Sequence, residues 1–270
     1  MAGVSSESLA AAQQQLESRL ATADLSLAED LFTILSLLDG NAGLRRALTD
    51  PARDGKDKAA LLSRLVAGKV SAAAEATAAD LAAARWRSAR DIGDALEVLA
   101  ATAAVAVAER QNGVEGLDAL EAELFAFTEV VGGSHDLQRA LDEPQASAEA
   151  KRTLALKLVP EASEPAKLLI GQAVSAPRGL KPVELVRRFN ELVAHRQQRW
   201  IAHVSVTRPL TAEQSTRLQA GLNNLYGREL TLNVSIEPEL VGGIRVAIGD
   251  EVLDASTIAR LGELRRRLAS

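Results

Sequence analysis

The chain carries an internal repeat. Residues 44–66, LRRALTDPARDGKDKAALLSRLV, align without gaps with residues 137–159, LQRALDEPQASAEAKRTLALKLV, and nine of the 23 aligned pairs are identical. The identities include a proline and a lysine, in the pairs Pro51/Pro144 and Lys58/Lys151. Chance similarity between two amphipathic helices does not put a proline and a lysine in the same register. The pattern therefore predicts two copies of one structural unit.

Each copy is expected to consist of helices joined by short turns. Apolar residues recur with the helical period, for example at Leu27, Leu31, Ile34, Leu35 and Leu38. In both copies a helix runs into the motif A-L-x-x-P and ends near its proline. The same offset extends upstream, which predicts that one long helix at about residues 93–111 closes the first copy and opens the second.

Prolines distinguish the second copy from the first. Four of them lie between residues 160 and 182, namely Pro160, Pro165, Pro177 and Pro182. Because proline interrupts a helix interior, we expect the helices of this part of the second copy to be shorter than their counterparts in the first.

The composition favours helices for the repeated part. Hydrophobic residues make up 47% of the chain and aromatic residues only 3%. The cores must therefore be built from Ala, Leu, Val and Ile, which suits closely packed helices better than sheet sandwiches.

The pattern changes after Trp200. The segment IAHVSVTRPL alternates apolar and polar residues as a half-buried strand does, and ELTLNVSIEPEL does so again. Between them, Thr211 and Gln214 have the spacing of a capping box at the start of a helix that closes near Gly227. GGIRVAIGDEVLD then predicts a third strand, a turn and a short continuation, and ASTIARLGELRRRLAS predicts a final helix.

The expected fold is therefore mostly α, with two tandem helical bundles that share a long helix, followed by a small α+β module of order β-α-β-β-α. The expected domains are residues 1–110 for the first bundle, 95–199 for the second with about 95–111 shared, and 200–270 for the module.

The glycines near the C-terminus are not expected to bind phosphate. A phosphate loop leads from its glycines into a helix and carries Lys-Ser/Thr or a further spaced glycine. Gly242 and Gly243 instead lead into a strand, so we expect them to form a bend or bulge between strands.

No catalytic, cofactor-binding or metal-binding residue is expected. The carboxylates of the module flank turns without a metal-loop pattern, and a cap by Asp254 or Ser256 is expected there; they are Glu237, Glu239, Asp250, Glu251 and Asp254. The three histidines, His135, His195 and His203, are not spaced as ligands. The sequence has no cysteine and no G-x-S-x-G motif, so nucleophilic catalysis has no candidate and no cofactor is expected.

Charge argues against nucleic acid and lipid as partners. The formal net charge is -5, which gives no general attraction to phosphate. The basic segment RRFNELVAHRQQRW contains only Phe189 and Trp200 for stacking, so we expect a solvated helix face. The N-terminus lacks the pattern of a signal peptide, and no apolar run has the length of a membrane span. We therefore expect no direct membrane insertion.

The segment LNVSIEPELVGGIRVAIGDEVLDASTIARLGELRRRL resembles the C-terminal signature of the δ subunit of bacterial F-type ATP synthases, called the oligomycin-sensitivity-conferring protein in mitochondria. The signature runs P-x-L-[IV]-G-G, a strand, G-D, an apolar pair and D-x-S before a Leu-rich helix. Ala247 and Ala255 are small departures from it. The helical units are similar to the N-terminal bundle of that family, and their duplication resembles the longer δ chains of actinobacteria.

The resemblance implies a non-catalytic peripheral-stalk subunit of a proton-translocating ATP synthase. In the family, a helical bundle binds the N-terminal helix of an α subunit on the F1 head, and the C-terminal module attaches to membrane-anchored b or b' subunits. Contacts with other F1 subunits and a peripheral location on the cytoplasmic face of the cell membrane are implied with these partners. A groove in an Ala/Leu-rich bundle suits a partner helix.

The resemblance leaves open which bundle binds the α helix. Adjacency to the C-terminal module favours the second, and the first is expected to add a contact with stalk or head. Two rival functions are a small-ligand-binding regulatory module, which residues 200–270 could form, and an RNA-binding adaptor. Micromolar metabolite binding would favour the former, and steeply salt-dependent RNA binding the latter.

Overall fold

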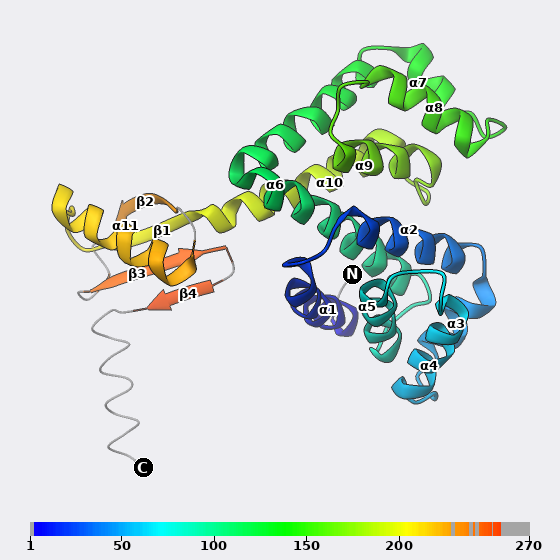
Figure 1. The fold of residues 1–270 in the computed structure, drawn as a ribbon, viewed down its shortest axis with the longest axis horizontal. Helices are drawn as coiled ribbons and strands as arrows, with labels where there is room; N and C mark the ends of the chain where they lie inside the picture. Colours follow the sequence, from blue (N-terminus) through cyan, green and yellow to red (C-terminus); the bar gives the residue numbers. More distant parts are fainter. Residues whose placement is uncertain (1–2, 228–229, 238–239, 241–242, 250, 255–270) are drawn as a thin grey trace. The chain divides into compact units, whose positions relative to one another are not determined.

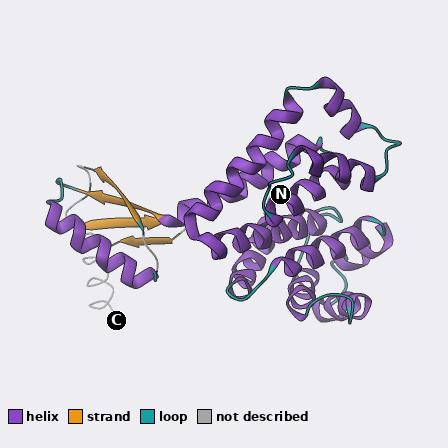
Figure 2. Ribbon diagram, turned by 45° about the horizontal axis from the view of Figure 1, so that its top comes forward, coloured by secondary structure: helices purple, strands orange, loops and turns teal. Residues whose placement is uncertain are grey.

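The computed structural model describes residues 3–227, 230–237, 240, 243–249 and 251–254. These residues fall into two compact units, 1–193 and 194–270, and the division lies inside the last helix of the first. The described residues are mostly helical and end in a small sheet (Figures 1 and 2), which confirms the predicted fold class.

The first copy of the repeat comprises six helices in chain order. They are α1 (Val4–Leu20), α2 (Leu25–Asp39), α3 (Ala42–Thr49), α4 (Gly55–Val66), α5 (Ala72–Ala83) and the beginning of α6 (Asp91–Gly132). The second copy uses the rest of α6 and continues through α7 (His135–Asp142), α8 (Ala148–Leu158), α9 (Glu164–Ser175) and α10 (Pro182–Gln197). In Figure 1 the green helix α6 is the element that both copies share.

The two copies match helix by helix and cap by cap. Helix α7 begins and ends 93 residues after α3, which is the offset of the sequence repeat. The N-cap side chains of the pair, Asn41 and Ser134, accept hydrogen bonds from Leu44 N and Leu137 N. The N-caps of α4 and α8, Asp54 and Ser147, are also 93 residues apart. Each cap satisfies an amide that the first helical turn leaves unpaired.

Side chains at equivalent positions also tie the helices together. Arg45 donates to the carbonyls of Leu38 and Asp39 at the end of α2. At the position 93 residues later, Gln138 donates to the carbonyls of Val131 and Gly132. The same bond is thus made by a guanidinium in one copy and an amide in the other, so the repeat conserves the geometry rather than the residue.

A second pair of contacts joins distant helices. The Asp30 carboxylate on α2 accepts from Ser71 N at the start of α5, with 2.7 Å between the atoms. At the position 93 residues later, the Glu123 carboxylate accepts from Ser163 N at the start of α9, at 2.9 Å. A charged acceptor at a helix N-terminus also interacts favourably with the helix dipole.

The shared helix has a kink. Helix α6 runs for 42 residues, and Asn112 and Gly113, next to the predicted end near residue 111, leave helical geometry. The kink corresponds to the break between α1 and α2 in the first copy. Gly113 has φ 61°, a left-handed conformation that glycine adopts without a steric penalty. Side chains between Leu96 and Ala108 are mostly small and buried, so neighbouring helices approach closely.

The prediction of shorter helices near the prolines of the second copy is wrong for α9, because α9 and α5 both have 12 residues. Helix α10, with 16 residues, is shorter than its counterpart α6. Pro165 lies in the first turn of α9 and Pro182 is the first residue of α10. The first turn of a helix tolerates proline because its amides have no helical partner. Pro160 and Pro177 lie between helices.

The second unit contains a four-stranded sheet of order β2-β1-β3-β4 with one helix packed on it. Its elements are β1 (Ile201–Val206), α11 (Ala212–Tyr226), β2 (Thr231–Ile236), β3 (Ile244–Ile248) and β4 (Glu251–Asp254). Strands β1 and β2 are parallel, joined by the crossover helix α11, and the other pairs are antiparallel. The capping box of Thr211 and Gln214 is present, and α11 ends at Gly227 as predicted.

Alternating residues of the strands form the core of this unit. Ala202, Val204 and Val206 of β1 are buried, and so are Val246 and Ile248 of β3. The predicted continuation of the third strand is a separate strand, β4, which folds back at Gly249 with φ 57°. The predicted final helix lies outside the described residues.

Candidate functional site

The three histidines lie on separate elements. His135 begins α7, His195 is near the end of α10, and His203 is in β1. Among the described residues, no group of three His, Cys, Asp or Glu side chains is arranged to hold a metal ion. In the same part of the chain, no helix is both long enough and apolar enough to cross a membrane.

The carboxylates and glycines of the module are placed as turn residues where they are described. Glu237 follows β2 and accepts a hydrogen bond from the Ser205 hydroxyl at 2.8 Å. Glu251 begins β4, and Gly243, with φ 88°, precedes β3. The remaining residues of that group, Glu239, Asp250, Gly242 and Ser256, lie outside the described residues, as does the Asp254 side chain, so the predicted cap is outside them too.

A shallow groove runs between α1 and α5. It has a volume of about 450 Å³ and is called here the α1–α5 groove. Its floor and walls are mostly small side chains, namely Ser8, Ala11, Ala12, Gln15, Ala83 and Ala84, with Glu7 and Asp80 at its margins. A surface of alanines lets another helix approach closely, because little side-chain volume separates the two backbones.

An ion pair crosses the two helices of the groove. Arg19 of α1 lies 2.6 Å from the Asp80 carboxylate of α5, and it also donates to the Thr77 hydroxyl at 3.2 Å. All three side chains are at least partly buried. The two terminal nitrogens of the arginine bond different side chains of α5, and this pair of contacts ties α1 to α5.

The residues of the second copy that correspond to the α1 side of the groove are enclosed. The residues 93 positions after the α1 side of the groove lie in α6 and are all buried, at most 5% exposed; they are Ala100, Ala101, Ala104, Val105 and Ala108. Helix α6 closes the first copy and opens the second, so both of its sides are covered. The face that α1 leaves open is therefore enclosed in the second copy.

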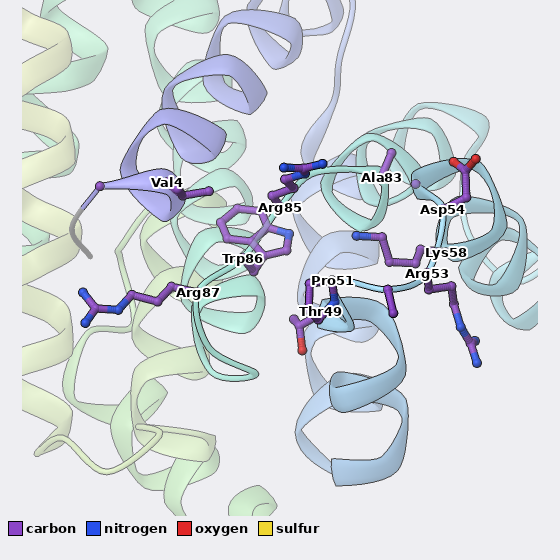
Figure 3. A pocket seen from close by; sticks show the side chains of 13 residues that line it. Val4, Thr49, Pro51, Arg53, Asp54, Lys58, Ala83, Arg85, Trp86 and Arg87 are labelled. Atoms are coloured by element: carbon purple, nitrogen blue, oxygen red, sulfur yellow. The ribbon is translucent and has the colours of Figure 1, made fainter.

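A larger cleft of about 880 Å³ lies beside the groove and is called here the Lys58 cleft. Figure 3 shows the basic side chains Arg53, Lys58, Arg85 and Arg87, together with Asp54 and Trp86, around it. Lys58 is only 3% exposed, and its Nζ donates to the Ala84 carbonyl at 2.8 Å. Burial lowers the pKa of Lys58, as does the Arg85 charge, while Asp50 and Asp54 oppose the shift.

A buried charge cluster lies where the two copies meet. Arg178, between α9 and α10, lies 2.8 Å from an oxygen of Asp39, 2.9 Å from one of Asp94 and 3.6 Å from one of Glu97. Gly93 leaves room for the guanidinium, because a Cβ there would lie 2.5 Å from Arg178 Nη2. Nearby, the Phe32 ring of α2 packs on the Phe189 ring of α10, with 6.4 Å between centroids.

Burial and neighbouring charges shift the pKa values of Glu97 and Arg178. Burial raises the pKa of Glu97, and the Arg178 charge only partly offsets that effect. Burial alone would lower the pKa of Arg178, but Glu97, Asp39 and Asp94 raise it above its ordinary value. Arg178 also has φ 52°, an uncommon conformation for a residue with a side chain, which these contacts stabilise.

Sequence reasoning missed both charged sites. Lys58 was visible as an identity within the repeat, but nothing local indicated that its ammonium is buried. The partners of Arg178 are between 81 and 139 residues away in the chain, so no spacing pattern could reveal them.

Comparisons with known proteins agree on one family. The family model described as ATP synthase delta (OSCP) subunit matches residues 100–268. The ATP synthase subunit delta of Pseudarthrobacter chlorophenolicus is 62% identical over 274 residues, covering all of both chains. The proteins of the same name from Renibacterium salmoninarum and Streptomyces coelicolor are 61% and 38% identical, and this chain is covered completely in both.

The solved structures that the chain resembles include a chain of the Toxoplasma gondii mitochondrial ATP synthase hexamer. The match covers 63% of this chain and 95% of the solved chain, with 22% identity and a TM-score of 0.33.

Proposed function

From the premise that the chain belongs to the ATP synthase delta (OSCP) subunit family, we propose that it links the catalytic F1 head to the membrane-anchored b subunits and resists the torque of the rotor. The family places it in the peripheral stalk of ATP synthase as a structural subunit. The proton-coupled complex, the N-terminal helix of an α subunit and the b or b' subunits are the proposed context and partners, on the cytoplasmic face of the membrane.

The α1–α5 groove carries the proposal of a head contact. It is an open channel between two helices, lined by alanines and bordered by polar side chains, and the Arg19–Asp80 ion pair holds its walls together. An amphipathic helix can lay its apolar face into such a groove. The family resemblance implies that the C-terminal module makes the contact with the b subunits.

Two observations favour different copies as the one that binds the α helix. The family model matches residues 100–268, which contain the second copy and the module, and adjacency to the module favours that copy. The groove residues of the second copy are buried, whereas those of the first are open. Because a partner helix needs an open surface, burial is the stronger argument, and we assign the contact to the first copy.

The duplicated region is suited to bearing load. Helix α6 belongs to both copies, and the Arg178 cluster and the Phe32–Phe189 contact join them as well. Relative motion of the two copies would require bending a packed helix and separating buried charges. Both processes cost free energy, so the region should transmit force as a stiff element.

A single assembly experiment tests the proposed role. The tagged chain, purified from detergent-solubilised membranes, is expected to bring down both α/β-type ATPase subunits and a b-type subunit. Recovery of the head without b, or of b without the head, would contradict a linking role.

A pair of variants tests the assignment of the groove. Ala11 lines the groove, whereas Ala10 is exposed on the same helix outside it. Ala11→Arg is expected to weaken binding of a synthetic α-subunit N-terminal peptide by about tenfold or more, and Ala10→Arg should leave it unchanged. Calorimetry on the full chain measures both. If the two variants bind like the unmodified protein, the contact belongs to another surface, with the second copy as the next candidate.

Point substitutions are preferable to truncation for this question. Deleting residues 1–90 would remove α1 to α5 and expose the alanine-rich face of α6 that they cover. Loss of binding after such a deletion would report unfolding as readily as loss of the site.

A further inference from the structure

We propose that the Lys58 cleft binds an acidic, extended segment of a partner polypeptide. This contact is distinct from the α1–α5 groove, and it does not depend on the assignment of that groove to the α-subunit helix. The occupant is defined by its chemistry: several carboxylates along a short stretch of extended chain.

Lys58 supplies the first observation. The residue is almost completely buried, yet its ammonium donates to a neutral carbonyl, that of Ala84. Asp50 and Asp54 act on this charge only from a distance, and no carboxylate of the described residues forms an ion pair with Lys58. A buried charge without a close counter-ion is unfavourable, so an anion that entered the cleft would relieve an existing penalty.

The surrounding charges supply the second observation. Arg53, Arg85 and Arg87 line the same cleft, with Asp54 as its acidic member. Asp54 is already engaged as the N-cap of α4. The lining is therefore strongly positive in a chain whose formal net charge is -5. Such a local field attracts and orients an acidic partner.

The second copy shows that the fold does not require the Arg53 charge. Position 146, which corresponds to Arg53, is alanine, and α8 begins two residues after it just as α4 begins two residues after Arg53. Lys151 corresponds to Lys58, so the lysine belongs to the repeat. The additional arginine is specific to the first copy, and its explanation must lie outside the packing of the unit.

The arrangement of the side chains selects an extended occupant. In Figure 3, Arg87 and Arg53 lie at opposite ends of the cleft, and Lys58 points inward between them. A compact anion such as phosphate could contact Lys58 but could not reach both ends. A chain with carboxylates at intervals could pair with all of them, and the volume of about 880 Å³ admits it.

The test uses a fluorescence signal that the cleft already contains. Trp86 lines the cleft, and the chain has one other tryptophan, Trp200. In full-length protein carrying Trp200→Phe, Trp86 alone reports on the cleft. A short oligoglutamate peptide is titrated at low ionic strength, with calorimetry on the unmodified chain as a second measurement. We expect saturable binding that weakens as salt is added, because salt screens exposed charges.

The variants are matched across the repeat. Lys58→Met should weaken oligoglutamate binding about tenfold, and Arg53→Gln or Arg87→Gln about two- to threefold. Lys151→Met, at the equivalent position outside the cleft, should have no effect. Circular dichroism establishes that each variant is folded. If Lys58→Met does not fold, the variants of the exposed arginines, Arg53→Gln and Arg87→Gln, still test the proposal.

Several results would overturn the proposal. They are the absence of saturable binding, equal effects of Lys58→Met and Lys151→Met, and inorganic phosphate binding as tightly as oligoglutamate, which would indicate a compact anion site. Tighter binding of an RNA oligonucleotide than of the peptide would assign the cleft to a different class of partner.

Discussion

Arg178, in the connection between α9 and α10, is surrounded by carboxylates. Its side chain is 10% exposed and has three carboxylates within 4 Å. Each copy contributes to the cluster, because Asp39 belongs to α2 and Arg178 to the connection before α10. A single side chain thus couples the packing of the two copies.

Replacing Arg178 should destabilise the helical unit strongly. Arg178→Met leaves Asp39, Asp94 and Glu97 close together without their cation, and removing one partner of a buried ion pair costs about 3–5 kcal/mol. Urea unfolding at pH 7 measures this loss. The loss should shrink as the pH is lowered towards 4, because protonation removes the repulsion among the carboxylates. A pH-independent loss would mean that packing, rather than charge, is responsible.

Glu97→Gln should have the opposite effect. The folded state raises the pKa of Glu97 above its ordinary value of 4.5. Its contribution to stability is therefore fully present below pH about 4.5 and is lost as the pH rises through the raised folded value. A permanently neutral Gln avoids that loss, so the variant should unfold at higher urea concentration than the unmodified chain at pH 7. The difference should vanish near pH 4, and destabilisation at pH 7 would contradict the stated cause.

At the scale of elements, α6 depends on the kink that joins its two halves. Gly113→Ala should cost about 1–3 kcal/mol, because φ 61° is unfavourable for a residue with a Cβ. Gly132→Ala is the matched control. That glycine ends the same helix without a positive φ, and a Cβ there would meet nothing within 4 Å. Thermal unfolding should separate the two variants, and equal melting temperatures would remove the special role of the kink.

The elements were predictable where the sequence repeats and less so where the copies differ. The offset of 93 residues anticipated the match of α3 with α7, because caps and apolar spacing are local properties. The predicted end of the shared helix near residue 111 falls beside Asn112 and Gly113, where α6 leaves helical geometry before it continues to Gly132. The prolines were a poor guide to helix length, because proline interrupts a helix only in its interior. Pro165 and Pro182 lie in the first turns of α9 and α10.

The candidate sites were less predictable than the elements. Sequence patterns gave an expectation of a helix-binding groove but not its location, because the open face of α1 and the buried face of α6 have similar alanine-rich sequences. The distinction between them is the presence of neighbouring helices, which is a tertiary property. The burial of Lys58 depends likewise on Ala84 and Trp86, which lie in a connection 26 to 28 residues away.

For the molecule as a whole, the division into two units predicts two unfolding events. The helical unit has an extensive core, whereas the second unit relies on a small cluster around β1 and α11. Trp86 reports on the first unit and Trp200 on the second, so Trp200→Phe and Trp86→Phe variants isolate the two signals. The second unit should unfold at lower denaturant concentration. Coincident transitions from both variants would show that the units unfold as one.

The sharing of α6 has a consequence for how such a protein can grow. Two complete bundles joined in series would need a linker, and a linker is a place where the chain can flex. Here α6 closes one copy and opens the next, so the added copy contributes the rest of α6 and the four helices α7 to α10 without a linker. Duplication of this kind adds whole copies of the helical unit without making the region more flexible, because each copy is joined to the previous one through a common core.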